Sequence, residues 1–297
     1  MRILFNNVNF KSRSGPNGFG LKLARQLHSR GHDIVNENAD VALSFIQGNI
    51  KNIKNVLRLD GIYFNSAQAW RQLNEPIKQS YDLADEIIVQ SNFNARLVRE
   101  YFGKRENVHV IHNGTDLSTI SSIPKAKLPI DFQSVWLCAS SWRPHKRLKD
   151  NIRYFQRVAD QDDVLIVAGD GDLSAMHAAK EAGENRIIYA GHLDWQSLIA
   201  AMQLADHFIH LAFLDHCPNV VVDALAAGCK IHCSSSGGTH EIAGANAAII
   251  EEDTWDFLPL ELYNPPPLQF SRIKSNKNYT IKNDIVEVAS MYEDVLL

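Results

Sequence analysis

The strongest constraint on this chain is the alternation of short, predominantly apolar runs with longer segments of helical period, which continues over most of its 297 residues. The runs 41–45, 86–89 and 164–168 are examples, and none has the strict polar–apolar alternation of a half-exposed strand. Strands of this kind are buried on both faces, which is typical of a parallel sheet covered by helices on both sides. The pattern predicts a doubly wound α/β fold.

The alternation is interrupted over residues 117–134, where serines and prolines replace the helical period. We therefore expect an N-terminal Rossmann-like domain over 1–116, a linker over 117–134 and a second Rossmann-like domain over 135–264. Residues 265–297 should form a tail that ends in a helix from Lys282 to Leu296 and packs back toward the N-terminal domain. Ligands bind outside the carboxyl ends of parallel strands, so two such domains facing each other should enclose an interdomain cleft.

Composition and charge exclude several classes of protein. Hydrophobic residues make up 45% and charged residues 22% of the chain, which excludes a disordered or fibrous protein. The net charge of −4 argues against a broad nucleic-acid surface. No apolar stretch approaches the about 20 residues that span a bilayer, and the four cysteines contain no Cys-x-x-Cys pair. We expect a cytoplasmic protein with reduced cysteines.

The most informative motif reads LDHCPNVVVDALAAG over residues 214–228, after the apolar run 207–210. Asp215 lies in a loop, and Asp223 follows after seven intervening residues inside a predicted helix. One carboxylate can accept hydrogen bonds from sugar hydroxyls and the other from a ribose diol; the alternative is an amphipathic helix with solvated acids. Free backbone N–H groups at the helix start would form an anion site. Those N–H groups belong to Asn219, Val220 and Val221.

A second motif, SSWRPHKRLKD, occupies residues 140–150 directly after the strand predicted over 135–139. Arginine offers a planar fork of donors and lysine a point charge, so Arg143 and Lys146 could clamp a diphosphate. The alternative is a solvated basic helix start. Positive charge there opposes the helix dipole, however, so the cluster is not present for helix stability.

Further candidate residues lie in turns after predicted strands. Gly15 and Gly18 belong to a glycine-rich segment that lets backbone N–H groups approach a phosphate or a sugar, or that is simply a flexible loop. Asp60 follows the strand predicted over 55–59, where a carboxylate would face the cleft, although aspartate is also a common turn residue. The remaining turns, 168–172 and 189–195, contain Gly169, Gly171, His192 and Leu193.

Together these motifs resemble retaining GT-B glycosyltransferases of family 4. Residues 215–223 resemble the E-x7-E region of that family with both glutamates replaced by aspartates, and 235–241 (SSGGTHE) resembles its continuation. The segment 110–116 resembles the signature that closes the first domain, and we interpret its Asn-Gly pair as a structural turn. The resemblance covers about residues 135–245 well and the first domain loosely. It implies a GT-B fold.

The resemblance also implies roles for the candidate residues. Lys146 and Arg143 would hold the pyrophosphate of the donor, although the arginine of the family lies about five residues before the lysine, where this chain has Ser141. Asp215 would orient the donor sugar and Asp223 would bind the ribose. The other expected substrate contacts are the nucleobase turns with Gly169, Gly171, His192 and Leu193, the opposite glycine segment with Gly15 and Gly18, and Asp60 near the acceptor.

The predicted activity is retaining transfer from a UDP- or GDP-sugar to a hydroxyl acceptor such as a glycan, with no metal and no cofactor. Asp170 and Asp172 spell D-x-D, but we expect no metal role for them because their position in a second βαβ domain does not suit that motif. One alternative is a catalytically inactive module that binds nucleotide sugars, which the two aspartates and the displaced arginine would explain. Another is a glycosyltransferase acting on modified nucleic acid, which the acidic net charge disfavours.

Overall fold

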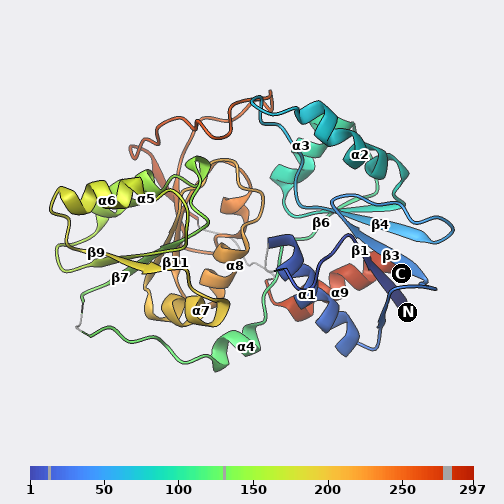
Figure 1. The fold of residues 1–297 in the computed structure, drawn as a ribbon, viewed down its shortest axis with the longest axis horizontal. Coiled ribbons are helices and arrows are strands. Elements are labelled where there is room, and N and C mark those ends of the chain that lie inside the picture. The colour runs from blue at the N-terminus through green and yellow to red at the C-terminus, as the bar shows by residue number, and fades with distance from the viewer. Residues whose placement is uncertain (13–14, 130–131, 277–282) are drawn as a thin grey trace.

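Two lobes, each built on one sheet, make up the computed structural model in Figure 1. The structure describes residues 1–12, 15–129, 132–276 and 283–297. In the N-terminal lobe the described strands form a parallel sheet in the order β2-β1-β3-β4-β5-β6. Their bounds are β1 Arg2–Asn6, β2 Asp33–Val35, β3 Val41–Phe45, β4 Lys54–Leu59, β5 Glu86–Val89 and β6 Val108–Val110.

Helices cover both faces of this sheet. Neighbouring residues of a strand point to opposite faces, and in these strands both are apolar, so both faces must be buried. Val56 packs on the side of α1 (Gly15–Ser29) and α9 (Ile285–Leu296). Leu57, the next residue of β4, packs on the side of α2 (Trp70–Leu83) and α3 (Asn92–Phe102). The absence of polar–apolar alternation in the sequence thus corresponds to a sheet with two buried faces.

The C-terminal lobe repeats this arrangement with the strand order β13-β12-β11-β10-β7-β8-β9 among the residues described. All its pairs are parallel except β12 with β13. Helices α7 and α8 pack on one face, and α5 and α6 on the other. The bounds are β7 Val135–Ala139, α5 Leu148–Val158, β8 Val164–Ala168, α6 Ser174–Glu181, β9 Ile187–Gly191, α7 Trp195–Leu204, β10 His207–His210, α8 Asn219–Ala226, β11 Lys230–Ser234, β12 Ala248–Ile250 and β13 Ile273–Ser275.

Chain segments connect the lobes at more than one place. The predicted linker begins with a short helix, α4 (Leu117–Ser122), whose Ile120 belongs to the core of the C-terminal lobe. The predicted tail contributes β13 to the C-terminal sheet before it returns to the N-terminal lobe as α9. Figure 1 shows α9, coloured red, beside α1, coloured blue. Lys282, where we expected the last helix to begin, lies outside the described residues.

The α/β class and the two-lobed Rossmann-like architecture expected from the sequence are confirmed. No helix in the ranges given above combines the length and the apolar character needed to cross a bilayer.

A buried histidine makes the stability of the C-terminal lobe pH-dependent. His232 on β11 is 4% exposed, and burial lowers its pKa to about 3. Its Nδ1 lies 3.0 Å from the Tyr154 hydroxyl, and its Nε2 lies 3.0 Å from Nδ1 of His207. In the unfolded chain the imidazole of His232 takes up a proton near pH 6.5, whereas in the folded protein it does so only near pH 3. The contribution of His232 to the free energy of unfolding is therefore fully present above pH 6.5 and is lost as the pH falls toward 3.

We predict that His232→Gln weakens the loss of stability between pH 6.5 and 4. The slope of the free energy of unfolding against pH should fall by about 1.4 kcal/mol per pH unit when this one group is removed. Urea unfolding at several pH values measures that slope. The matched control is His177→Gln, which changes an exposed histidine on α6 and should leave the slope intact. An unchanged slope in His232→Gln would show that its buried ring does not control the acid response.

Candidate active site in the interdomain cleft

A cavity of about 530 Å³ lies between the lobes, at the carboxyl ends of both sheets. In the C-terminal sheet the chain builds β7, β8 and β9 outward and then returns to β10 on the other side of β7. Strand order reverses there, and the loops after β7 and β10 diverge and leave a crevice. The cavity is lined from this side by residues such as Ser140 and Asp215, and from the N-terminal lobe by Gly15, Asp60 and Asn113.

Lys146 and Asp215 meet in this cavity from different loops. The Lys146 Nζ lies 2.5 Å from Oδ2 of Asp215, and Nε2 of His210 lies 3.0 Å from the same oxygen. Burial opposes ionisation of Asp215, yet Lys146 and the hydrogen bond from His210 hold its pKa well below the usual range. Burial lowers the pKa of His210, so its neutral ring donates Nε2–H to an ionised carboxylate. The group is an oriented lysine–carboxylate pair at the cavity wall.

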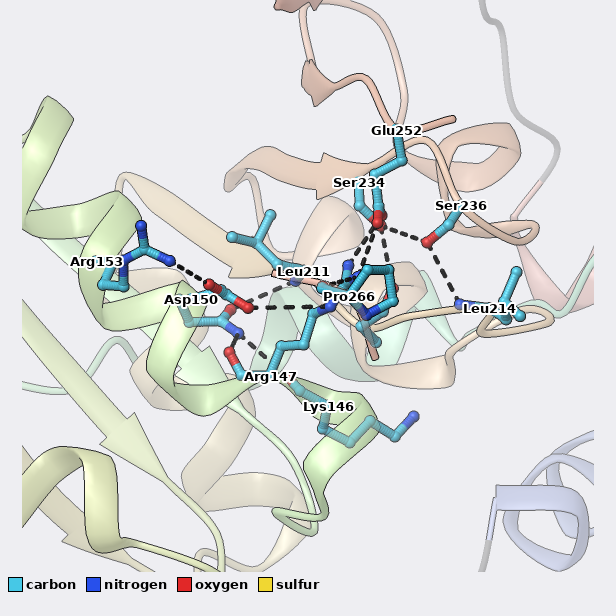
Figure 2. Close-up of polar contacts among 12 residues, drawn as sticks. Lys146, Arg147, Asp150, Arg153, Leu211, Leu214, Ser234, Ser236, Glu252 and Pro266 are labelled. Carbon is cyan, nitrogen blue, oxygen red and sulfur yellow. Dashed lines mark hydrogen bonds and ion pairs between the residues drawn. The ribbon is translucent and has the colours of Figure 1, made fainter. Parts of the chain in front are cut away.

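The neighbouring cation, Arg147, has a different role. Figure 2 shows its side chain directed toward Glu252 and Pro266, whereas Lys146 points away from them. Arg147 is 3% exposed and makes a bidentate pair with Glu252 at 2.9 and 2.8 Å. Its guanidinium also lies over the ring of Phe213, 4.7 Å from the centroid. Arg147 therefore fixes the loop that carries Lys146.

Arg143 supplies a second cation at the cavity. It precedes the turn η1 (Pro144–Lys146), lines the cavity and is exposed. Within the part of the chain that the structure describes, its guanidinium makes no ion pair. Arg143 is thus available to a ligand while Lys146 is already positioned by Asp215.

Two glycines allow the loops after β7 and β8 to approach each other. Gly169 has φ +103°, and a Cβ there would lie 1.9 Å from the Ser140 carbonyl oxygen. Gly171 has φ +125° and pairs in a parallel bridge with Trp142, so a Cβ would lie 2.2 Å from the Trp142 oxygen. Gly169 lines the cavity, whereas Gly171 is outside its lining and shapes the loop. His192 and Leu193, from the turn after β9, complete this wall.

The start of helix α8 faces the cavity with fewer free donors than we expected. The N–H of Val221 donates to the Pro218 oxygen at 3.0 Å, so the prediction that it is free was wrong. The tight turn at Pro218 closes this hydrogen bond one residue earlier than a regular helix would. The N–H groups of Asn219 and Val220 have no partner in the described chain, and both residues line the cavity.

Asp223 lies outside the cavity lining. Its Oδ1 is 3.2 Å from the Lys22 Nζ, and its Oδ2 accepts a hydrogen bond from the Trp195 indole at 3.0 Å. The lysine of α1 also donates to the Thr115 hydroxyl at 3.0 Å. Both carboxylate oxygens are thus occupied by partners, one of them from the opposite lobe.

The glycine-rich segment differs from the expected loop. Helix α1 begins at Gly15, so Gly18 lies in its first turn and not in the cavity lining. Gly15 lines the cavity, and its carbonyl oxygen accepts a hydrogen bond from Nδ2 of Asn219 at 2.9 Å. Ser14, which begins the motif, lies outside the described residues. The first helical turn of one lobe is thus tied to the first helical turn of α8 in the other.

Asp60 lines the cavity from the N-terminal lobe, and its Oδ1 accepts hydrogen bonds from Arg58 and Gln90. Burial raises the pKa of Asp60 against the opposing charge of Arg58. Its Oδ2 is buried and has no partner among the described residues. The Oδ2 atom of Asp60 is thus a buried acceptor that receives no hydrogen bond from the described residues.

Asn113 is a cavity residue whose position we did not predict. We interpreted it as part of a structural turn, but its Nδ2 donates to the Cys217 oxygen at 3.1 Å and to Oδ1 of Asn219 at 2.9 Å. Its side chain therefore joins the first domain to the start of α8. Gln90 and His216 also line the cavity and were missed: Gln90 lies outside the motifs, and His216 lies inside the motif 214–228 but was given no role there.

Two Rossmann-like lobes facing such a cleft define the GT-B class of glycosyltransferase folds. The C-terminal lobe matches the family model described as Glycosyl transferases group 1 over residues 133–258, and the N-terminal lobe matches the model described as Glycosyltransferase Family 4 over residues 3–119. No curated protein matches the chain in sequence.

Several solved glycosyltransferases share the fold. HepE of Anabaena, in complex with UDP and glucose, superposes with a TM-score of 0.65 and 14% identity over 100% of this chain and 99% of its own. A sucrose-phosphate synthase of Thermosynechococcus elongatus gives 0.65 and 12% over 84% of this chain and 86% of its own. AviGT4, involved in avilamycin A biosynthesis, gives 0.66 and 12% over 100% and 97%.

Proposed function

We propose that this protein is a retaining glycosyltransferase that transfers a sugar from a nucleoside diphosphate sugar, with UDP as the favoured nucleotide, to a hydroxyl of a glycan or glycoconjugate. One observation carries the proposal. Lys146, the exposed Arg143 and the free N–H groups at the start of α8 converge on one cavity at the switch point of the C-terminal sheet. The choice of UDP follows HepE, whose structure contains UDP and glucose.

The charges at this cavity suit a departing diphosphate. Negative charge grows on the β-phosphate as the bond to the anomeric carbon breaks, and preorganised cations and N–H donors are most effective at that moment. Lys146 is held in place by Asp215 at 2.5 Å and so needs little reorganisation. We propose that these groups stabilise the leaving group without a metal ion. Within the described ranges no three His, Cys, Asp or Glu side chains are grouped as metal ligands.

The low pKa of Asp215 bears on the route of the proton. A carboxylate whose pKa lies well below the usual range is a weak base. We infer that the leaving diphosphate, and not Asp215, takes the proton of the acceptor hydroxyl, and that attack on the same face retains the anomeric configuration. In this scheme Asp215 orients the donor sugar, and Asp60 orients the acceptor.

The ribose role of Asp223 remains a proposal that requires a rearrangement. Its oxygens are held by Lys22 and by Trp195, so a ribose diol would have to replace one of these partners. Relative movement of the lobes would separate Lys22 from Asp223, since the two residues come from α1 and α8.

The first test is a thermal-shift panel of UDP-, GDP-, ADP- and CDP-sugars. A matching donor at one hundred times its dissociation constant stabilises the native state by about 2.7 kcal/mol, which should raise the melting temperature by about 5 °C. The donor that gives this shift is then supplied with a panel of glycan acceptors, and nucleoside diphosphate release is followed. Stabilisation without turnover would favour the inactive binding module, and no shift with any donor would contradict nucleotide-sugar binding.

A further inference from the structure

A second, smaller cavity adjoins the main one. It measures about 210 Å³ and shares Asp215 and His216 with the main cavity. Its other walls come from the loop after β4, from His145 and from a segment of the C-terminal lobe around Tyr263. That segment crosses to the N-terminal lobe, where the N–H of Ser66 donates to the Leu260 oxygen at 2.8 Å. The cavity is therefore built from both lobes.

Three residues that line this cavity each have a buried side-chain nitrogen with no hydrogen-bond partner among the described residues: Nδ2 of Asn65 and Nδ1 of His145 and His216. Asn65 is only 3% exposed, and its Oδ1 accepts a hydrogen bond from the N–H of Ala67 at 3.1 Å. Its amide is thereby oriented with the NH₂ group left over. Buried polar groups are almost always paired, so three unpaired ones around a single hollow indicate a ligand with several hydrogen-bonding groups.

The wall favours a neutral ligand. Burial lowers the pKa of His145 and of His216 to about 4, so both rings are uncharged near pH 7 and each can donate one hydrogen bond and accept another. Asp215, at the boundary with the main cavity, is an ionised carboxylate. Hydroxyl groups, which both donate and accept, match this set of partners.

Aromatic rings complete the lining. Tyr63 and Tyr263 both line the cavity, and each is 41% exposed. The backbone of Tyr63 is fixed by Asn74, whose side chain accepts from its N–H at 2.9 Å and donates to its oxygen at 2.7 Å. His145 lies 5.2 Å from the Tyr263 ring. Apolar ring surface with a few convergent polar groups is the usual composition of a small-molecule site, and it suits the C–H face of a pyranose.

We propose that the second cavity is the acceptor subsite and binds one neutral sugar ring, with the reacting hydroxyl at the boundary formed by Asp215 and His216. The assignment rests on the proposed function and specifies its acceptor. The acceptor oxygen bonds to the anomeric carbon of the donor, the bond from that carbon to the diphosphate oxygen breaks, and the hydroxyl proton passes to the leaving diphosphate. An uncharged sugar terminus is thus the acceptor class, in preference to a uronic acid or a phosphorylated sugar.

The test measures binding of simple glycosides to protein saturated with UDP, by saturation-transfer NMR. The probes are the methyl glycosides of glucose, galactose and mannose, with methyl glucuronide as the charged counterpart. At least one neutral glycoside should bind saturably and more tightly than the glucuronide. Asn65→Ala should weaken that binding about tenfold, because it removes one buried hydrogen bond. The dissociation constant of UDP, measured by calorimetry, should stay within about twofold, because Asn65 is outside the lining of the main cavity.

Two further variants keep the result interpretable. Asn264→Ala makes the same change on an exposed residue outside this cavity and should leave glycoside binding unchanged. His145→Phe keeps an aromatic ring at this position while removing both nitrogens, and it should reproduce the effect of Asn65→Ala even if that variant folds poorly. Normal UDP affinity without glycoside binding, or with binding that is insensitive to both cavity variants, overturns the acceptor subsite and leaves the proposed function standing. Absence of UDP binding, together with no thermal shift for any of the four nucleotide sugars, overturns the proposed function and the subsite with it.

Discussion

Replacing Lys146 by alanine is expected to reduce kcat for sugar transfer by about 10²–10³-fold, which corresponds to the loss of one preorganised group that stabilises charge in the transition state. The ammonium of Lys146 lies at the cavity wall where the diphosphate would depart, and it is held there by Asp215. Alanine removes the charge and also leaves the Asp215 carboxylate with only neutral donors, His210 and the backbone N–H of His216, among the described residues. The effect should appear mainly in kcat under saturating donor, measured by release of the nucleoside diphosphate.

The control for this prediction is Lys149→Ala. Lys149 is exposed on α5, three residues beyond Lys146, and it does not line the cavity. The Lys149→Ala variant loses the same charge from the same motif but keeps the cavity wall unchanged. Its kcat should therefore remain near that of the unmodified protein. The melting temperatures of both variants separate a catalytic effect from unfolding. Near-normal turnover in Lys146→Ala would remove this residue from the diphosphate clamp.

The sequence predicted the fold best where burial of a strand directly determines its residue pattern. The run 164–168 is apolar at every position because β8 is buried on both faces, and this alone favoured a parallel sheet. Loops at the carboxyl ends of such strands must meet, so the chemistry of Lys146 and Asp215 could be assigned to one cleft although 69 residues separate them. These inferences depend on periodicity and topology, which a single sequence contains.

Side-chain partners that are distant in the sequence were not accessible in the same way. Lys146 and Arg147 are adjacent cations in one motif, and composition does not say that the second is buried against Glu252. Asp223 occupies the motif position of a ribose ligand, but its partner Lys22 lies 201 residues away on α1. The Arg147–Glu252 pair depends on tertiary packing within the C-terminal lobe, and the Lys22–Asp223 pair depends on how the two lobes are oriented. Neither hydrophobic period nor local propensity encodes such contacts.

Buried polar networks were also invisible in the sequence. Arg58 lies in the strand predicted over 55–59, and its position in the sequence does not say whether its side chain is solvated or buried. In the structure it is completely buried, with Phe19 and Phe45 4.3 and 4.9 Å from its guanidinium carbon. It is an exception to the rule that arginine stays at the surface, and such exceptions are paired with other polar groups.

Arg58→Met is expected to destabilise the protein by about 3–5 kcal/mol, the usual cost of removing one partner of a buried ion pair. The guanidinium donates to Asp60, to the Tyr292 hydroxyl at 2.8 Å and to Oδ1 of Asn113 at 2.8 Å. Methionine fills part of the space between the rings but leaves these acceptors unsatisfied. Tyr292 belongs to α9 and Asn113 contacts the start of α8, so the loss should also loosen the junction of the lobes. Urea unfolding measures the change in the free energy of unfolding.

A second substitution shows whether the uncompensated carboxylate causes this loss. Asp60→Asn added to Arg58→Met removes the charge that Arg58 neutralised, and it should recover part of the stability, since a buried charge without a partner is the costly species. The reference is Arg157→Met, the same replacement at an exposed position on α5, which should change the free energy of unfolding by less than about 0.5 kcal/mol. If the double variant is no more stable than Arg58→Met, packing against Phe19 and Phe45, and not the Arg58–Asp60 pair, accounts for the stabilisation.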